Sequence, residues 1–293
     1  MKFKDAAALL PMSLYSQMLV LPDDITQKCE EIRLRTGYPM SLLYDGQEHE
    51  IFRERCVCAD DIATVLEKAT DASLHCAQHS ISEGYINARG GIRIGLCGTG
   101  YKKENGLNAL REYSSVAIRI PHEVHDCGVE LLSQVMQTGL SDILIISAPG
   151  AGKTSCLREY LRRISDMGYR VSLIDERGEV SCTAFGAAQF DVGAHTDIML
   201  NIPKREAAVM MLRALNPQLI AMDEISSAED IRAVEEISGC GVKILATAHA
   251  QDLNDLQKRP IYVKMLDMRI FRYAIIIKNT DGRRKYLLEE LYR

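Results

Sequence analysis

The chain has 293 residues, enough for two domains of ordinary size, and its 47% apolar and 26% charged composition is typical of a folded globular protein. A net charge of −5 argues against a protein that coats nucleic acid, although a local basic patch is compatible with it. No apolar run approaches the roughly 20 residues of a membrane-spanning helix, and the first residues lack the pattern of a signal peptide. We therefore expect a cytosolic protein.

The nine cysteines are scattered along the chain, and only Cys56 and Cys58 lie close together. A zinc site would need a second pair of ligands at a similar spacing, which the sequence does not contain. We therefore expect reduced thiols that serve mostly as small apolar side chains.

Residues 1–125 predict a small domain of mixed α and β structure. Short strand-like runs surround one stretch of helical spacing, and Asp45-Gly46 is typical of a hairpin turn. In chain order we expect an apolar opening segment (6–21), a strand (31–35), a hairpin (41–43 with 51–52), a helix (62–69) and two strands (91–97 and 116–120). Pro121, with the polar residues up to Asp126, predicts the end of this domain.

In residues 126–293 apolar strands alternate with amphipathic helices. We expect strands at 142–146, 171–174, 219–222 and 242–246. Strands separated by helices predict a parallel sheet with helices on both faces. Ligands of such sheets bind beyond the carboxyl ends of the strands, where this sequence places its charged clusters. Asp281-Gly282 additionally predicts a C-terminal hairpin.

A loop that contains two glycines joins the first of these strands to a helix. Backbone N–H groups of such a loop converge on phosphates, and the helix N-terminus adds its positive end. Ser147 stands where the usual pattern has its first glycine, but that position only leads from the strand into the loop, so a small residue should serve. The predicted nucleotide-binding residues are Ser147, Ala148, Pro149, Gly150, Ala151, Gly152, Lys153, Thr154 and Ser155.

Three residues are expected to hold the phosphates and the magnesium ion of ATP. Lys153 would reach the β- and γ-phosphates, and the Thr154 hydroxyl would bind Mg²⁺. Asp223 closes the buried strand 219–222 and is the second expected magnesium ligand.

Glu224 indicates hydrolysis, because a carboxylate beside the magnesium ligand can orient and deprotonate a water molecule. The alternative is that Asp223 and Glu224 only cap the next helix. Ser226 and Glu229 weaken this alternative, since they offer a separate capping box.

Asp175 and Glu176 end the strand at 171–174, where they could line the same crevice or form a solvated ion-pair cluster. His249 ends the strand after the acidic pair and could sense the γ-phosphate, although a lone histidine is often structural. Some arginines could stabilise transition-state charge in a neighbouring subunit, and the sequence does not single out which. They are Arg33, Arg35, Arg93, Arg119, Arg213 and Arg232, of which Arg213 joins Lys153, Glu224 and His249 as a catalytic candidate.

Taken together, these segments resemble the stage III sporulation protein AA family over nearly the whole chain. The phosphate loop is generic, whereas the glycine-rich strand around Arg93 and the Asp-Glu-Arg segment are more specific. The matching segments are 31–35, 90–98, 115–119, 147–154, 175–179, 222–225 and 246–250.

The resemblance implies a RecA/AAA-like P-loop sheet preceded by a smaller α+β domain, as in the ring-forming ATPases of type II secretion and type IV pilus systems. It implies a homo-hexamer that uses ATP and Mg²⁺ in the mother-cell cytoplasm of an endospore-forming bacterium, docked on a membrane-embedded channel complex. It further implies that Asp175-Glu176 is an acidic box, that His249 belongs to a histidine box, and that arginines 33, 35, 93 and 119 contribute to the nucleotide pocket.

Three other functions are compatible with a phosphate loop. A nucleic-acid-stimulated NTPase is weakly supported, because the chain has no tryptophan and no dense basic-aromatic stripe. A small-molecule kinase is disfavoured by Glu224 and by the lack of an acceptor-binding lid. An ATP-gated scaffold that scarcely hydrolyses ATP is also compatible with the sequence.

Overall fold

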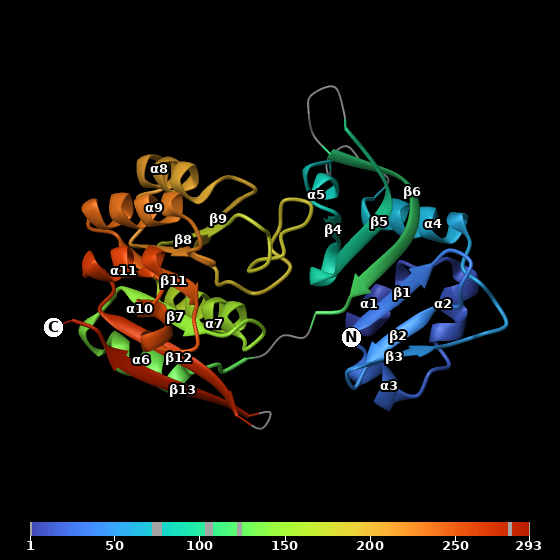
Figure 1. Ribbon diagram of the computed structural model, residues 1–293, viewed down its shortest axis with the longest axis horizontal. Helices are drawn as coiled ribbons and strands as arrows, with labels where there is room; N and C mark the ends of the chain where they lie inside the picture. The colour runs from blue at the N-terminus through green and yellow to red at the C-terminus, as the bar shows by residue number, and fades with distance from the viewer. Residues whose placement is uncertain (1, 72–77, 103–107, 122–124, 281–282, 293) are drawn as a thin grey trace. The chain divides into compact units, whose positions relative to one another are not determined.

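The computed structural model describes residues 2–71, 78–102, 108–121, 125–280 and 283–292. The chain forms two compact units (Figure 1). The first comprises Met1–His122 and Cys182–Phe190, and the second comprises Glu123–Ser181 and Asp191–Arg293. The segment Cys182–Phe190 follows the acidic residues of the second unit in sequence and yet belongs to the first. The predicted second domain, residues 126–293, includes this segment, and nothing in its composition signals a place in the first unit.

The first unit is built on an antiparallel sheet of six described strands in the order β3-β2-β1-β6-β5-β4. The strands are β1 (Glu31–Arg35), β2 (Ser41–Tyr44), β3 (Gln47–Glu50), β4 (Tyr85–Asn87), β5 (Arg93–Lys102) and β6 (Asn108–Arg119). The described helices are α1 (Lys2–Ala8), α2 (Met12–Met18), α3 (Asp23–Lys28), α4 (Ala59–Ala69) and α5 (Gln78–Ser82), with a single turn at Arg89–Gly91. Apolar side chains from α1, α2, α4 and the central strands share one buried core, which makes this unit an α+β domain.

The segment Cys182–Phe190 packs on the single turn at Arg89–Gly91. The Gly90 N–H donates to Gln189 Oε1 at 2.8 Å, and the Cys182 thiol donates to the Gly91 carbonyl at 3.3 Å. A Cβ atom at Gly91 would lie 2.9 Å from the Phe190 ring, so only glycine permits this approach. Gly91 also has a φ of +77°, which side chains disfavour.

The second unit is built on a sheet of seven described strands in the order β13-β12-β7-β11-β10-β8-β9. Neighbouring strands run parallel except β13, which pairs antiparallel with β12. The strands are β7 (Ile143–Ser147), β8 (Val171–Asp175), β9 (Thr196–Leu200), β10 (Leu219–Met222), β11 (Lys243–His249), β12 (Tyr273–Thr280) and β13 (Arg283–Glu290).

Helices cover both faces of this sheet. Successive side chains of a strand point to opposite faces, and each set packs with different helices. Ile143 and Ile145 of β7 pack with α6 and α7, whereas Leu144 and Ile146 pack with α8, α9 and α11. The helices are α6 (Val129–Val135), α7 (Lys153–Asp166), α8 (Lys204–Ala214), α9 (Ala228–Gly239), α10 (Leu253–Gln257) and α11 (Pro260–Asp267), with a single turn at Met136–Thr138. The predicted parallel sheet with two helix layers is confirmed.

Some elements differ from those expected. Strand β4 was not predicted, and the second strand of the first hairpin is Gln47–Glu50 rather than 51–52. Strand β9 was not predicted, because the run 196–200 is only partly buried and mixes polar with apolar residues. The capping box of α9 lies one residue later than expected, with Ser227 as N-cap and Asp230 as its partner. The strands of the C-terminal hairpin are present, while Asp281-Gly282 lies outside the described residues. In the part of the chain that the structure describes, no helix has the length and apolar character needed to span a membrane.

Candidate functional site

The phosphate loop lies at the carboxyl end of β7, between that strand and α7. Ser147 is the last strand residue and is fully buried, and its hydroxyl donates to the Ala148 carbonyl at 2.9 Å. Gly150 and Gly152 have φ values of +74° and +106°, so both positions need glycine. Lys153 is the first residue of α7, which places Thr154 and Ser155 in its first turn, where N–H groups lack intrahelical partners.

The Lys153 ammonium is buried among polar groups of neighbouring strands. Its Nζ lies 2.8 Å from His249 Nδ1 and 3.5 Å from the Ser147 carbonyl. It forms no ion pair with any described carboxylate, and burial lowers the pKa of this amine while the charges of Asp223 and Glu224 oppose that shift. A buried cation without a direct counter-ion is well suited to receive an anion such as phosphate.

Two hydroxyl groups and one carboxylate gather beside this lysine. Thr154 Oγ1 lies 3.4 Å from Asp223 Oδ2, and Thr247 Oγ1 donates to Asp223 Oδ1 at 2.9 Å. Thr247 Oγ1 also accepts from the Glu224 N–H at 2.9 Å, so one side chain orients both acidic residues. A hydroxyl oxygen and a carboxylate oxygen from neighbouring elements fit Mg²⁺, which takes few protein ligands and fills its shell with phosphate and water oxygens.

Glu224, His249 and Lys153 lie in one row of polar contacts. The Lys153 ammonium can only donate, so the nearer ring nitrogen, Nδ1, accepts. The other ring nitrogen, Nε2, lies 3.2 Å from Glu224 Oε2. The Tyr262 hydroxyl donates to the Ile225 carbonyl at 2.9 Å and accepts from the His249 N–H at 3.3 Å, which joins the backbones of the two strand ends.

Asp175 is buried below the site rather than directed into it. Its carboxylate accepts from the N–H groups of residues 179, 180 and 181 and from the Ser181 hydroxyl at 2.6 Å. The structure therefore places Asp175 in a turn that leads towards Cys182, and its assignment as a nucleotide contact stays a prediction. Glu176 pairs with Lys204 at 2.7 Å, an ion pair that includes a buried lysine, so the predicted ion-pair alternative describes it better.

Arg213 does not lie with the other catalytic candidates. It is in the last turn of α8, six residues before β10 begins, and its side chain is exposed. This is the amino edge of the sheet, whereas Lys153, Asp223 and His249 lie at the carboxyl edge. A catalytic role for Arg213, including one at the site of a neighbouring subunit, stays a prediction. Arg177 was not selected, yet its guanidinium lies 3.7 Å from Glu224 Oε2.

The four N-terminal arginines differ in their contacts and in their exposure to solvent. Arg33 pairs with Glu31, Arg35 pairs with Glu48, and Arg93 stacks over the Tyr85 ring at 3.9 Å. Arg119 is the most exposed of the four, with 68% of its side chain accessible and Glu31 at 3.5 Å.

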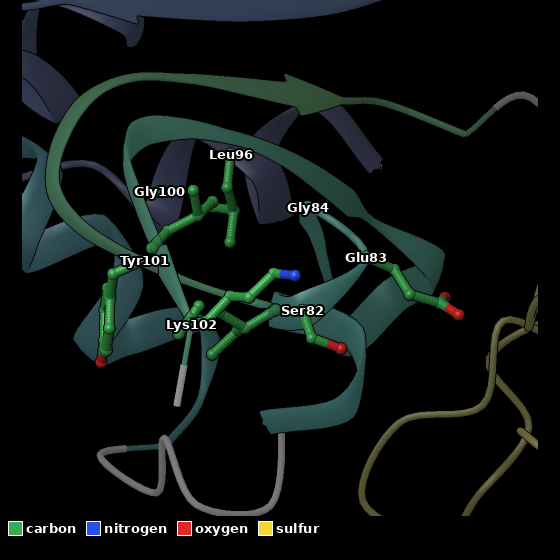
Figure 2. Close-up of a pocket in the computed structure, with 10 residues that line it drawn as sticks. Ser82, Glu83, Gly84, Leu96, Gly100, Tyr101 and Lys102 are labelled. Atoms are coloured by element: carbon green, nitrogen blue, oxygen red, sulfur yellow. The ribbon is translucent and has the colours of Figure 1, made fainter. Parts of the chain in front are cut away.

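The positions of two cavities can be compared with those of the predicted nucleotide-binding residues. The first unit contains one of about 610 Å³ (Figure 2), where the Lys102 side chain lies among residues of α5 and β5. None of the predicted nucleotide-binding residues lines it. A second cavity of about 440 Å³ lies beside the phosphate loop, between Ala148, Gln251 and Lys278. Of these two cavities in the described part of the chain, the second adjoins the phosphate loop.

The chain is similar to known proteins in sequence and in fold. The family model described as "Sporulation stage III, protein AA" matches residues 7–287. Stage III sporulation protein AA of Bacillus subtilis (strain 168) is 30% identical over 284 residues, which cover 95% of this chain and 92% of that protein.

Solved structures with this fold include an ATPase and a pilus retraction motor. The ATPase DotB of Legionella pneumophila superimposes with a TM-score of 0.59 at 15% identity, over 98% of this chain and 78% of that one. The pilus retraction motor PilT with bound ADP gives a TM-score of 0.55 at 12% identity, over 91% and 80% of the two chains. The predicted P-loop ATPase fold with a preceding α+β domain is thereby confirmed.

Proposed function

The chain belongs to the stage III sporulation protein AA family, and from this premise we propose that it binds Mg·ATP at the phosphate loop of residues 147–155 and hydrolyses it. The observation that carries the proposal is the meeting of Lys153, Thr154, Asp223, Glu224 and His249 at one edge of the second sheet. These residues come from three separate strand ends, and each bears the functional group that ATP hydrolysis requires at its position.

Each residue has a distinct proposed task. The loop N–H groups and the Lys153 ammonium bind the β- and γ-phosphates, and Thr154 with Asp223 holds the magnesium ion. Glu224 orients the attacking water and accepts its proton, while His249 fixes the Glu224 carboxylate and responds to the γ-phosphate through Lys153. Bound Mg²⁺ supplies charge neutralisation at the β- and γ-oxygens. Asp175 acts indirectly, by shaping the turn that follows β8.

We further propose that six copies form a ring that powers or assembles a membrane channel complex during endospore formation. Support comes from the family and from the fold shared with the ATPase DotB and the pilus retraction motor PilT. The exposed guanidinium of Arg119 fits a role at the nucleotide of a neighbouring subunit.

The test is ATP hydrolysis by the purified full chain, with Lys153→Ala and Glu224→Gln assayed beside it. We expect Lys153→Ala to lose ATP binding, because the buried ammonium is removed. Glu224→Gln should keep ATP binding and lose at least about 100-fold in kcat, because the amide cannot accept a proton. Glu235→Gln is the matched control, since it makes the same chemical change at an exposed position of α9.

The outcomes separate the possible functions. Hydrolysis that both variants abolish supports the proposal. Tight ATP binding without hydrolysis, with or without added membrane fractions, would instead favour a nucleotide-gated scaffold. A wild-type chain that binds no ATP would refute the proposal.

A further inference from the structure

The C-terminal hairpin runs past the end of β7 and along the phosphate loop. Strand β12 pairs with β7 up to the pair Ile277 and Ser147, and then continues to Thr280. Lys278 and Asn279 therefore lie beside the loop, and they line the 440 Å³ cavity together with Pro149. The β13 residue opposite Asn279 is Arg284.

Arg284 lies directly on the phosphate loop. A Cβ atom at Gly152 would stand 3.0 Å from Arg284 Cζ and 3.1 Å from Arg284 Nε, so the guanidinium is in contact with the residue before Lys153. Strand alternation explains the direction of this side chain: Tyr286 and Leu288, on the same face of β13, pack into the core that contains α7.

This guanidinium has no acidic partner within the described part of the chain, and the residue is exposed. A purely structural arginine at a loop edge would be expected to pair with a carboxylate, as Arg163 and Arg272 do in the same unit. Among the described residues, Arg284 instead presents to the loop, which is expected to hold an anion, a charge that no carboxylate pairs.

The order of the strands indicates which part of the nucleotide Arg284 faces. The groups expected at the terminal phosphate, Glu224 and His249, follow β10 and β11, on one side of β7. Arg284 belongs to β13, on the other side of β7. A nucleotide whose γ-phosphate lies towards β10 and β11 extends its α-phosphate and ribose towards β12 and β13.

We propose that Arg284 is a nucleotide-binding residue that contacts the α-phosphate of ATP and ADP in the same subunit. The inference rests on the proposed function and deepens it. A guanidinium offers a planar set of donors that can bind two phosphate oxygens at once. Because the α-phosphate is common to both nucleotides, Arg284 strengthens the binding of ATP and ADP alike and does not act on the hydrolysis step.

The experiment measures the Kd of ATP and of ADP, with Mg²⁺, by titration calorimetry on the full chain and three variants. Arg284→Gln should raise the Kd of both nucleotides by about 10- to 100-fold, the range for a lost charge-assisted hydrogen bond to phosphate. Arg284→Lys keeps the positive charge but loses the planar pair of donors. Its Kd values should therefore lie between those of wild type and Arg284→Gln. Lys285→Gln is the matched control, because its exposed side chain leaves the opposite face of the same strand, and it should stay within about twofold of wild type.

Steady-state kinetics give a second readout that a structural role would not produce. Arg284→Gln should raise the KM for ATP and leave kcat within about threefold, because binding is weakened equally in the ground and transition states. Wild-type affinity for both nucleotides in Arg284→Gln would overturn the inference while leaving the proposed function intact. If Arg284→Gln loses affinity for ATP alone, the α-phosphate assignment is overturned. If Lys285→Gln loses as much affinity as Arg284→Gln, the effect comes from general surface charge and the inference is overturned. A wild-type chain that binds neither nucleotide would refute the proposed function itself.

Discussion

At the scale of single residues, the site is organised around one hydroxyl. Thr247 is fully buried in β11 and is the only residue in the described chain whose side chain bonds to both Asp223 and the Glu224 N–H. It fixes the proposed magnesium ligand and the proposed base relative to each other. Its catalytic effect should therefore act through the positions of these two carboxylates.

We predict that Thr247→Val lowers kcat by about 10- to 100-fold, because valine has nearly the same shape and no hydroxyl to orient the two acidic residues. The Mg²⁺ concentration for half-maximal activity should rise as well, since Asp223 loses a fixed hydrogen-bond partner. Thr247→Ser, which keeps the hydroxyl, should restore most of the activity. Equal kcat in Thr247→Val and wild type, measured at saturating Mg·ATP, would show that Thr247 is structural only.

Thr247 also shows how far single residues could be predicted. Lys153, Thr154, Asp223, Glu224 and His249 were selected because each ends a strand or begins a helix, and parallel strands end at a common edge. Thr247 was visible as a polar residue in an apolar strand, yet no local pattern says which side chain it contacts. The partners of Asp175 could not be predicted for the same reason, because they are backbone N–H groups of a turn without a sequence signature.

At the scale of secondary-structure elements, a cluster of polar side chains links the edge strand β3 of the first sheet to β2 and β1. Arg35 of β1 donates to Glu48 of β3, and Ser41 of β2 donates to the same carboxylate at 2.6 Å. The hydrogen bond from Arg35, followed by that from Ser41, lowers the pKa of Glu48 from 4.5 to about 2. The charged form of Glu48 therefore stabilises the pairing of the short strand β3.

We predict that Glu48→Gln lowers the free energy of unfolding by about 1 kcal/mol at pH 7, a value kept small because a third of the side chain is exposed to solvent. The folded pKa lies below the unfolded one, so this stabilisation is complete above about pH 5 and is lost as the pH falls from about 4.5 to 2. The difference between variant and wild type should shrink over the same interval in denaturant titrations of the full chain. Glu50→Gln, at an exposed ion pair with Arg53, is the control; a Glu48→Gln difference that is constant with pH would contradict the argument.

Elements were predictable where the local pattern was strong. The strands of both sheets that alternate or run fully apolar were found, and Asp45-Gly46 marked the β2–β3 hairpin. Strand β9 and the segment Cys182–Phe190 were not found, because their places depend on contacts far along the chain. Phe190 is buried only because Gly91, about 100 residues earlier, leaves room for its ring.

At the scale of the whole molecule, the proposed ring requires that each nucleotide site receive a group from a second copy of the chain. Among the N-terminal arginines, Arg33 and Arg35 are tied to carboxylates and Arg93 to an aromatic ring, whereas Arg119 is largely exposed. Arg119 is therefore the arginine that could serve a neighbouring site with the least loss of existing contacts.

We predict that Arg119→Ala lowers the ATPase rate at least about 100-fold in the pure variant, within the range for a transition-state arginine supplied in trans. Mixing it with Glu224→Gln should restore activity. In a mixed ring, a subunit with intact Glu224 can lie beside a subunit with intact Arg119, and the site between them is complete. The specific activity of wild type should also rise with protein concentration, because dilution separates the subunits.

Two controls make the mixing experiment decisive. A mixture of Glu224→Gln with Lys153→Ala should stay inactive, because both changes lie in the same half of the site and no arrangement of neighbours completes it. Arg53→Ala, which removes an exposed arginine from the same unit, should leave the wild-type rate unchanged. If Arg119→Ala mixed with Glu224→Gln gives no more than the sum of the separate rates while the wild-type rate is independent of concentration, each chain completes its own site, and the shared-site mechanism is refuted even though the ATPase assignment stands.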